Sequence, residues 1–301
     1  MPPRHRLLPL IALGTTLVLW ASAFVGIRFL APHFDPGTLT LGRLVVGSLA
    51  LGLTLLASAN WVSPTPREWA AMALIGVLWF GVYNLALNAA ERLIDAGTAA
   101  MLVQISPILI ALLSALFLKE RVHIWLVIGM AVAFAGVVLI GTSGSGTGHS
   151  NVLGAGLCVV AALTYSISLV IQKPLVGRLS ALQVTWVACT VGVLASAPFA
   201  ASLAHDLSAA PVSAIAWLVY LGVFPTAIAF TAYAYALKYV PASGLGVSTY
   251  LVPPITALIS LVALHEVPPA ITWIGGALCL AGVALTRRVA ATPTAQRTPQ
   301  D

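Results

Sequence analysis

Long, continuously apolar runs separated by short polar stretches make up most of this chain. A helix that crosses the roughly 30 Å hydrocarbon core of a bilayer needs about 20 mainly apolar residues, because each residue rises about 1.5 Å. Strands of a membrane barrel would instead alternate and be about half as long. The pattern predicts an all-α integral membrane protein with ten transmembrane helices over residues 7–30, 37–58, 69–90, 96–118, 124–141, 151–172, 181–203, 213–237, 242–264 and 270–286.

The second half of the chain repeats the first at an offset of 146 residues, which is 253 minus 107. The informative matches are Pro107 with Pro253, Ser114 with Ser260, Glu120 with Glu266 and Gly76 with Gly222. Five helices per repeat is an odd number, so the second repeat starts on the opposite side of the membrane and the two repeats become inverted in space. We expect repeats over residues 1–141 and 151–290, a flexible linker over 142–150 and a disordered tail over 291–301.

The distribution of charged residues predicts how the chain is oriented in the membrane and argues against a nucleic-acid partner. Charged residues are 7% of the chain, against roughly 25% in soluble domains. Basic residues gather on the side of the N-terminus, and only Arg28 and Arg92 fall on the other side. The positive-inside rule therefore places both termini in the cytoplasm of a multi-pass inner or plasma membrane protein. The net charge of +6 follows from this topology and predicts no nucleic-acid partner.

The sequence also bears on a signal peptide, on metal or disulfide sites, on cofactors and on helix packing. Arg4 and Arg6 before an apolar run that reaches Ala23 resemble a signal peptide, but the run is too long and its removal would leave the repeats unequal. Cys158, Cys189 and Cys279 lie in apolar spans without a second ligand, so we expect no metal and no disulfide. The chain has no Walker loop and implies no ATP or other cofactor. Small residues at Gly129, Ala133, Gly275 and Cys279 predict close helix approach, either between the fifth and tenth spans or between protomers of a weak homodimer.

Candidate binding residues are aromatic and polar side chains far from the ends of their spans. Such a side chain needs a polar partner or a water-filled cavity. The repeat relates Gln104 to Tyr250 and, at an offset of 145 (165 minus 20), Trp20 to Tyr165. Packing between helices is the alternative explanation for each aromatic residue. We expect a small amphipathic solute at the repeat interface, held by Trp20, Ser22, Arg43, Trp79, Tyr83, Asn84, Gln104, Tyr165 and Tyr250.

Arg43 is a lone charge inside a span, and its repeat counterpart, near Ala188 or Cys189, is uncharged. A guanidinium at this depth can receive a carboxylate from a solute. The alternative is that it extends to the membrane interface or pairs with a helix end such as the one that bears Asp35.

Glu120 and Glu266 each lie at the end of an apolar span. They either gate transport or relay protons, or they cap the helix that follows. We favour the capping role. Pro107 and Pro253 are expected to kink their spans and act as hinges or open backbone carbonyls.

The motifs Leu19-Trp20-Ala21-Ser22-Ala23, Ser106-Pro107-Ile108 and Leu118-Lys119-Glu120-Arg121, with Val252-Pro253-Pro254 and Leu264-His265-Glu266 in the second half, resemble the EamA-type transporters of the drug/metabolite transporter superfamily. The resemblance covers residues 7–288 and implies ten helices in two inverted repeats, a central cavity, and ATP-independent export of amino acids, metabolites or drugs. Ala23 stands where such proteins often carry Asn, and Tyr165 where they often carry Trp.

We therefore predict a secondary transporter, not an enzyme, that exports small amphipathic metabolites such as hydrophobic or aromatic amino acids by alternating access. Proton coupling stays open, because no carboxylate lies in the middle of a span, and an uncoupled facilitator fits equally well. The rival from another class is an intramembrane serine hydrolase with Ser143 in a Gly-Thr-Ser-Gly turn. No His lies in a span where it would face Ser143, which argues against this rival.

Overall fold

The computed structural model describes residues 4–58, 61–93, 102–142, 152–264 and 270–286, and every element in them is helical. The first half of the chain forms α1 (Arg4–Leu30), α2 (Pro36–Ser58), α3 (Pro66–Ile75), η1 (Gly76–Tyr83), α4 (Asn84–Leu93), α6 (Ser106–Phe117) and α7 (Ile124–Thr142). The second half forms α8 (Val152–Arg178), α9 (Ala181–Ala195), η2 (Ala197–Phe199), α10 (Ala200–Ala209), α11 (Val212–Leu221), η3 (Gly222–Ile228), α12 (Ala229–Tyr239), α13 (Ala242–Ser248), η4 (Thr249–Leu251), α14 (Val252–Leu264) and α15 (Ala270–Thr286).

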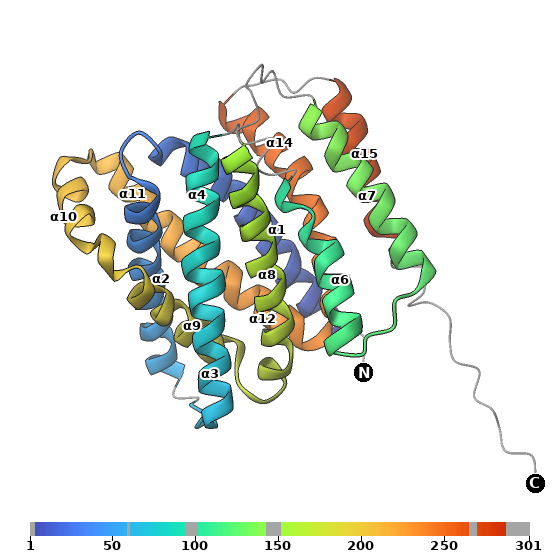
Figure 1. Cartoon of the computed structure of the whole chain (residues 1–301), viewed down its shortest axis with the longest axis horizontal. Helices are drawn as coiled ribbons and strands as arrows, with labels where there is room; N and C mark the ends of the chain where they lie inside the picture. Colours follow the sequence, from blue (N-terminus) through green and yellow to red (C-terminus); the bar gives the residue numbers. More distant parts are fainter. Residues whose placement is uncertain (1–3, 59–60, 94–101, 143–151, 265–269, 287–301) are drawn as a thin grey trace, which may run out of the picture.

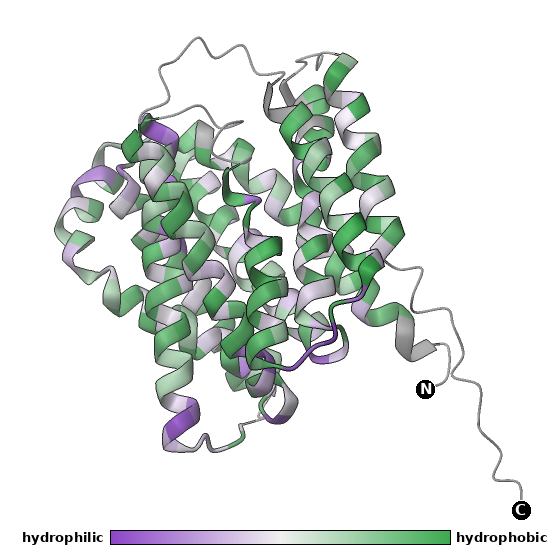
Figure 2. Ribbon diagram, turned by 45° about the vertical axis from the view of Figure 1, so that its right-hand side comes forward, coloured by the Kyte–Doolittle hydropathy of each residue, from purple (hydrophilic) through white to green (hydrophobic). Residues whose placement is uncertain are grey.

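Helix occupies part or all of each predicted apolar window. Five helices or continuous helix runs are long and apolar enough to cross a membrane: Leu7–Ile27, Pro36–Ser58, Pro66–Leu93, Val152–Arg178 and Val212–Tyr239. A sixth span is formed if Ala181–Ala195 and Ala197–Ala209 are counted together across their 55° bend, and α6, α7 and α15 contain shorter apolar helices. Many large apolar residues are exposed on the helices. Most of the helical ribbon is hydrophobic, and hydrophilic stretches occur mainly toward helix ends and in connections (Figure 2). The count of ten crossings and the cytoplasmic termini stay predictions.

The third and eighth spans contain π-helical segments at matching positions of the repeat. The segment η1 begins at Gly76 and η3 begins at Gly222, the residue 146 positions later. Each glycine lies against a helix of the other half: a Cβ on Gly76 would lie 2.6 Å from the Ala188 carbonyl oxygen, and one on Gly222 would lie 2.8 Å from that of Arg43. Arg43 and Ala188 are themselves counterparts at the offset of 145 that also relates Trp20 to Tyr165, so the two halves pack on each other through paired contacts.

The helices α7 and α15 lie side by side along most of their length (Figure 1). They approach through glycines: a Cβ on Gly136 would lie 2.4 Å from the Gly275 carbonyl oxygen, and one on Gly282 would lie 2.6 Å from that of Gly129. The thiol of Cys279 contacts the carbonyl of Ala133 at 3.5 Å. The predicted close approach of small residues is therefore formed between the fifth and tenth spans within one chain.

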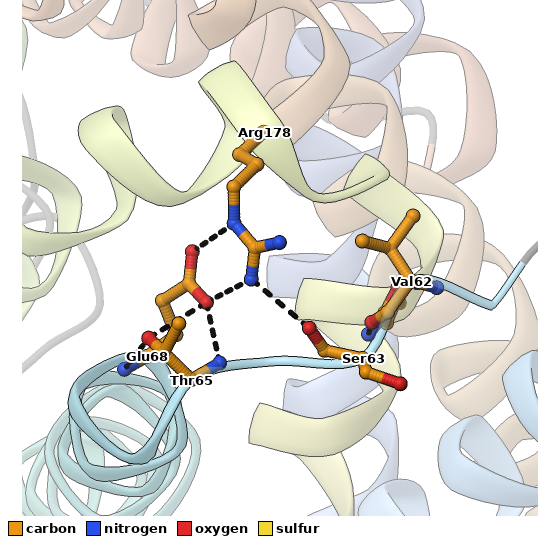
Figure 3. Close-up of polar contacts among 6 residues, drawn as sticks. Val62, Ser63, Thr65, Glu68 and Arg178 are labelled. Carbon is orange, nitrogen blue, oxygen red and sulfur yellow. Dashed lines mark hydrogen bonds and ion pairs between the residues drawn. The ribbon is translucent and has the colours of Figure 1, made fainter.

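Polar contacts hold the α3 end of the bundle together (Figure 3). The side chains of Thr65 and Glu68 form a capping box at the start of α3. The Arg178 guanidinium, at the end of α8, donates to both carboxylate oxygens of Glu68 and, at 3.1 Å, to the Ser63 carbonyl. Because these side chains are partly exposed, the ion pair positions the α3 and α8 ends more than it stabilises the fold.

Thr142, the first residue of the predicted linker, is the last residue of α7. Residues 143–150 of the linker, the predicted disordered tail, Glu266 and Ser143 lie outside the described residues.

Candidate functional site

Aromatic rings from both halves of the chain meet inside the bundle. We call this group the aromatic cluster: Trp20 on α1, Trp79, Phe80 and Tyr83 on η1, Tyr165 on α8, and Phe230 and Tyr233 on α12. Trp20 has its ring centroid 4.8 Å from that of Tyr233 and 5.4 Å from that of Phe230. Trp79 lies 4.9 Å from both Tyr165 and Phe230 by the same measure. Rings at these separations attract each other beyond the effect of burial alone.

Two members of the cluster keep part of their surface accessible, while the others are buried. Trp20 and Tyr83 are half-buried, whereas Trp79 and Tyr233 are buried. The Tyr165 and Tyr233 hydroxyls satisfy each other at 2.7 Å. The Trp20 indole Nε1 is buried and has no hydrogen-bond partner. An indole N–H normally finds an acceptor when it is buried, so Trp20 brings an unused hydrogen-bond donor to this cluster.

Sequence reasoning found four members of the cluster and missed Phe80, Phe230 and Tyr233. The repeat does not pair these three with other aromatic residues; Phe230 corresponds to Asn84 and Tyr233 to Leu87 at the offset of 146. The available signal was spacing, because residues three apart on α12 face the same direction. Only the packing of α12 against α1 shows that this face meets Trp20.

Arg43 lies inside the bundle, 5% exposed, and does not pair with Asp35. Its Nε and Nη2 atoms donate to the Thr226 hydroxyl oxygen of η3 at 3.2 and 3.1 Å. Thr226 in turn donates its hydrogen to the Leu221 carbonyl at 2.8 Å. Asp35 is paired instead with Arg92, at 2.7 Å. The pairing near Asp35 is therefore not formed, and the burial of the guanidinium does not favour its extension toward solvent.

Two buried amides, those of Asn84 and Asn88, lie one turn apart on α4. The Asn84 amide donates to the Trp79 and Phe80 carbonyls of the π-helical segment at 3.1 and 3.0 Å, so it stabilises the backbone there. One turn further, the Asn88 amide nitrogen donates to the Thr40 hydroxyl of α2 at 3.0 Å. The Asn88 Oδ1 atom is buried without a partner.

Three other predicted residues lie away from the aromatic cluster. The Ser22 hydroxyl is 2.7 Å from that of Tyr220. The Gln104 amide donates to the Thr249 carbonyl at 2.9 Å, which joins the fourth and ninth spans. Tyr250 is fully buried beside Phe134, in the apolar cluster around α7 and α15, and its hydroxyl has no partner. The structure therefore does not bring these three residues together with Trp20.

Glu120 caps a helix, but the helix belongs to the other half of the chain. Its carboxylate accepts from the backbone amides of Ala242 and Ser243 at 2.8 and 3.1 Å, and from the Ser243 hydroxyl at 2.7 Å. Lys173 of α8 donates to the carbonyls of Leu237 and Val240, both at 2.5 Å. The two side chains hold the α12–α13 corner, the carboxylate at the start of α13 and the ammonium at the end of α12, as the helix dipoles favour.

Pro107 and Pro253 lie in the first turns of α6 and α14. Backbone N–H groups in a first turn have no partner within the helix, so a proline there removes no helical hydrogen bond. The breaks come just before them, at the turn preceding Ser106 and at η4.

Lys119, next to Glu120, is the residue where the chain leaves α6 with a left-handed backbone, at φ 55°. This conformation costs a residue with a Cβ about 1–2 kcal/mol, and glycine almost nothing. We expect Lys119→Gly to raise the free energy of unfolding by about 1 kcal/mol in detergent, measured by denaturant titration. Arg121→Gly, at an exposed neighbour, is the control and should not stabilise the protein. Equal effects of the two substitutions would contradict the strain at Lys119.

Within the described residues, no three His, Cys, Asp or Glu side chains group as metal ligands. The site is therefore built from rings, amides and one guanidinium.

A sequence model of the EamA-like transporter family matches the chain twice, at residues 8–142 and 152–288. The chain belongs to the EamA-like transporter family. It is a multi-pass membrane protein and a transporter. The aromatic cluster draws α1 and η1 from the first match and α8 and α12 from the second, so both matched units contribute to it.

Relatives of this EamA-like protein cover nearly its whole length. A protein of Streptantibioticus cattleyicolor named as a probable terminal-alkyne amino-acid exporter is 36% identical, over 92% of each chain. The uncharacterized transporter YdfC of Bacillus subtilis is 33% identical, over 89% of this chain and 87% of that one. A solved crystal structure shares the fold at a TM-score of 0.77 and 25% identity, covering 93% of this chain and 96% of that chain.

Proposed function

We propose that this protein is a secondary transporter of the cell membrane that exports small amphipathic metabolites, with hydrophobic and aromatic amino acids as the favoured class. The observation that carries the proposal is the aromatic cluster, which both matched units build and in which Trp20 is half-buried with an unpartnered N–H. Rings supply apolar contact area and a few polar groups orient the guest, which is the usual character of a small-molecule site. The name of the Streptantibioticus cattleyicolor relative supports an amino acid as the solute.

Alternating access in this proposal is the movement of two inverted five-helix repeats about the aromatic cluster. The paired contacts of Gly76 with α9 and of Gly222 with α2 support an inverted relation of the halves. The described acids Asp35, Glu68, Glu91, Glu120 and Asp206 lie at or near helix ends or in connections. An uncoupled facilitator therefore stays the second candidate, because no described carboxylate lies within the aromatic cluster to carry a proton.

The test is counterflow into proteoliposomes with L-phenylalanine, L-leucine and a terminal-alkyne amino acid as separate solutes. Trp20→Ala should weaken the apparent affinity for the transported solute roughly tenfold, because one ring contact and one buried apolar surface are lost. Trp273→Ala is the matched control, since Trp273 is 44% exposed near the end of its span, and should transport as the parent does. Absence of transport for all three solutes, or equal transport by both variants, would overturn the proposal.

A further inference from the structure

Arg43 carries a buried positive charge and forms no ion pair with a carboxylate. Its side chain bonds only to the neutral Thr226 hydroxyl, and the ion pairs of the described residues are Arg92 with Asp35 and Arg178 with Glu68. A guanidinium has five N–H donors, and two of these converge on a single oxygen here. Removing a charge from water without a counter-ion costs several kcal/mol, so packing alone is a poor reason to place arginine there.

The repeat itself shows that this helix contact does not need a charge. Arg43 on α2 lies against η3, and its counterpart Ala188 on α9 lies against η1 with the same close glycine contact. The carbonyl of Leu221 is already satisfied by Thr226. The contact of Ala188 with Gly76 is as close as the contact of Arg43 with Gly222. Close packing of the two helices therefore does not require the guanidinium, which is present in the first half only.

A free acceptor lies on the neighbouring face of α4. Thr40 is one turn before Arg43 on α2. Its hydroxyl donates its hydrogen to the Pro36 carbonyl at 2.7 Å. Asn88 must therefore present its amide nitrogen to Thr40, which leaves Oδ1 as the atom without a partner. Asn88 is 4% exposed, so this oxygen is an unsatisfied acceptor inside the protein.

Arg43 also adjoins the aromatic cluster. Tyr83, Cys189 and Glu91 lie close enough to the guanidinium to interact with it electrostatically. Tyr83 is a half-buried member of the cluster, with its ring centroid 6.0 Å from that of Tyr165. The bond between Thr40 and Asn88 joins α2 to α4 one turn from Arg43. A solute whose apolar end rests on the rings can therefore extend its polar end toward this contact.

We propose that α2 and α4 form a head-group site for a free α-amino acid, in which Arg43 binds the carboxylate and Asn88 Oδ1 accepts a hydrogen bond from the ammonium. This inference rests on the proposed function and specifies its substrate: both charged groups of the amino acid are recognised. The charge-assisted bond to Arg43 is the stronger of the two, so the carboxylate contributes more to affinity than the ammonium does.

The experiment uses three ligands with the same aryl end, L-phenylalanine, 3-phenylpropionate and phenethylamine, binding to the detergent-solubilised full chain by calorimetry. The parent protein should rank them in that order. Arg43→Gln should weaken binding of the two carboxylates about 10- to 100-fold and leave phenethylamine unchanged, and Arg43→Lys should restore part of the loss. Asn88→Leu should weaken the two ligands that carry an ammonium, L-phenylalanine and phenethylamine, and leave 3-phenylpropionate unchanged. Trp20→Ala should weaken all three ligands alike.

The outcomes separate the two proposals. If phenethylamine binds the parent as tightly as L-phenylalanine, or if Arg43→Gln leaves the ranking unchanged, the head-group site is wrong while an aryl site sensitive to Trp20→Ala still stands. If none of the three ligands binds and none of the amino acids is transported, the proposed function fails and the head-group site with it. The ranking by the parent protein decides the question even where a variant does not fold.

Discussion

Replacing Glu120 by alanine should destabilise the protein by about 3 kcal/mol or more. The substitution removes the acceptor of two backbone amides and one hydroxyl at the start of α13. Bonds to a charged group contribute about 1.5–3 kcal/mol each, and the loss of a cap alone about 1 kcal/mol. It also leaves the Lys173 ammonium without the nearby negative charge that acts on it. A thermal melt in detergent should show a decrease in Tm on the order of 5–10 °C.

Glu120→Gln keeps one acceptor oxygen and loses the charge, so it should fall between the parent and Glu120→Ala. Arg121→Ala, at the exposed neighbour, should melt as the parent does. Because Glu120 joins the α6–α7 connection of the first half to the eighth and ninth spans of the second half, the loss should also change the rate of counterflow. If Glu120→Ala and Arg121→Ala melt together, the carboxylate is not holding α13.

The second large effect is expected at the crossing of α7 and α15. A Cβ on Gly136 would lie 2.4 Å from the Gly275 carbonyl oxygen and 2.8 Å from the Cys279 amide nitrogen. Both obstacles are backbone atoms, which move only if the helices separate. We expect Gly136→Ala to cost about 3 kcal/mol, at the upper end of the usual penalty for overpacking, as measured by thermal unfolding in detergent.

Gly156→Ala is the matched control, because Gly156 also lies within a helix and a Cβ there meets nothing within 4 Å. That substitution should be neutral or stabilise by about 0.4–1 kcal/mol, since alanine restricts the unfolded chain. The two alanine variants should therefore differ in the sign of their effect. A Gly136→Ala protein as stable as Gly156→Ala would mean that α7 and α15 do not approach as closely as the structure shows.

The fold class could be read from the sequence because the bilayer simplifies the problem. Every backbone polar group in hydrocarbon must be bonded within its own segment, so a long apolar run can only be a helix. The same reasoning does not predict the interruptions. The π-helical segments at Gly76 and Gly222 and the 55° bend after Ala195 depend on contacts with other helices. The repeat paired the two glycines correctly, but only the packing shows what they approach.

The candidate site was predicted in part for a similar reason. Trp20, Trp79, Tyr83 and Tyr165 were singled out by depth in their spans, and they do meet. Tyr250 satisfied the same criterion and packs elsewhere, beside Phe134. Depth along a helix does not say which direction a side chain faces, so Phe230 and Tyr233 could not be added and Tyr250 could not be removed.

The sequence by itself determined that this chain is a multi-pass helical transporter built by duplication, because hydropathy and paired residues are properties of the chain in order. The tertiary structure alone decided which side chains meet: that Glu120 caps α13 rather than the helix that follows it, that Arg43 bonds Thr226, and that α7 crosses α15. The physical reason is that these contacts join residues far apart in the chain, through helix rotations that an apolar surface leaves undetermined. In lipid, both faces of such a helix are apolar, so the residue pattern does not indicate which face is inside.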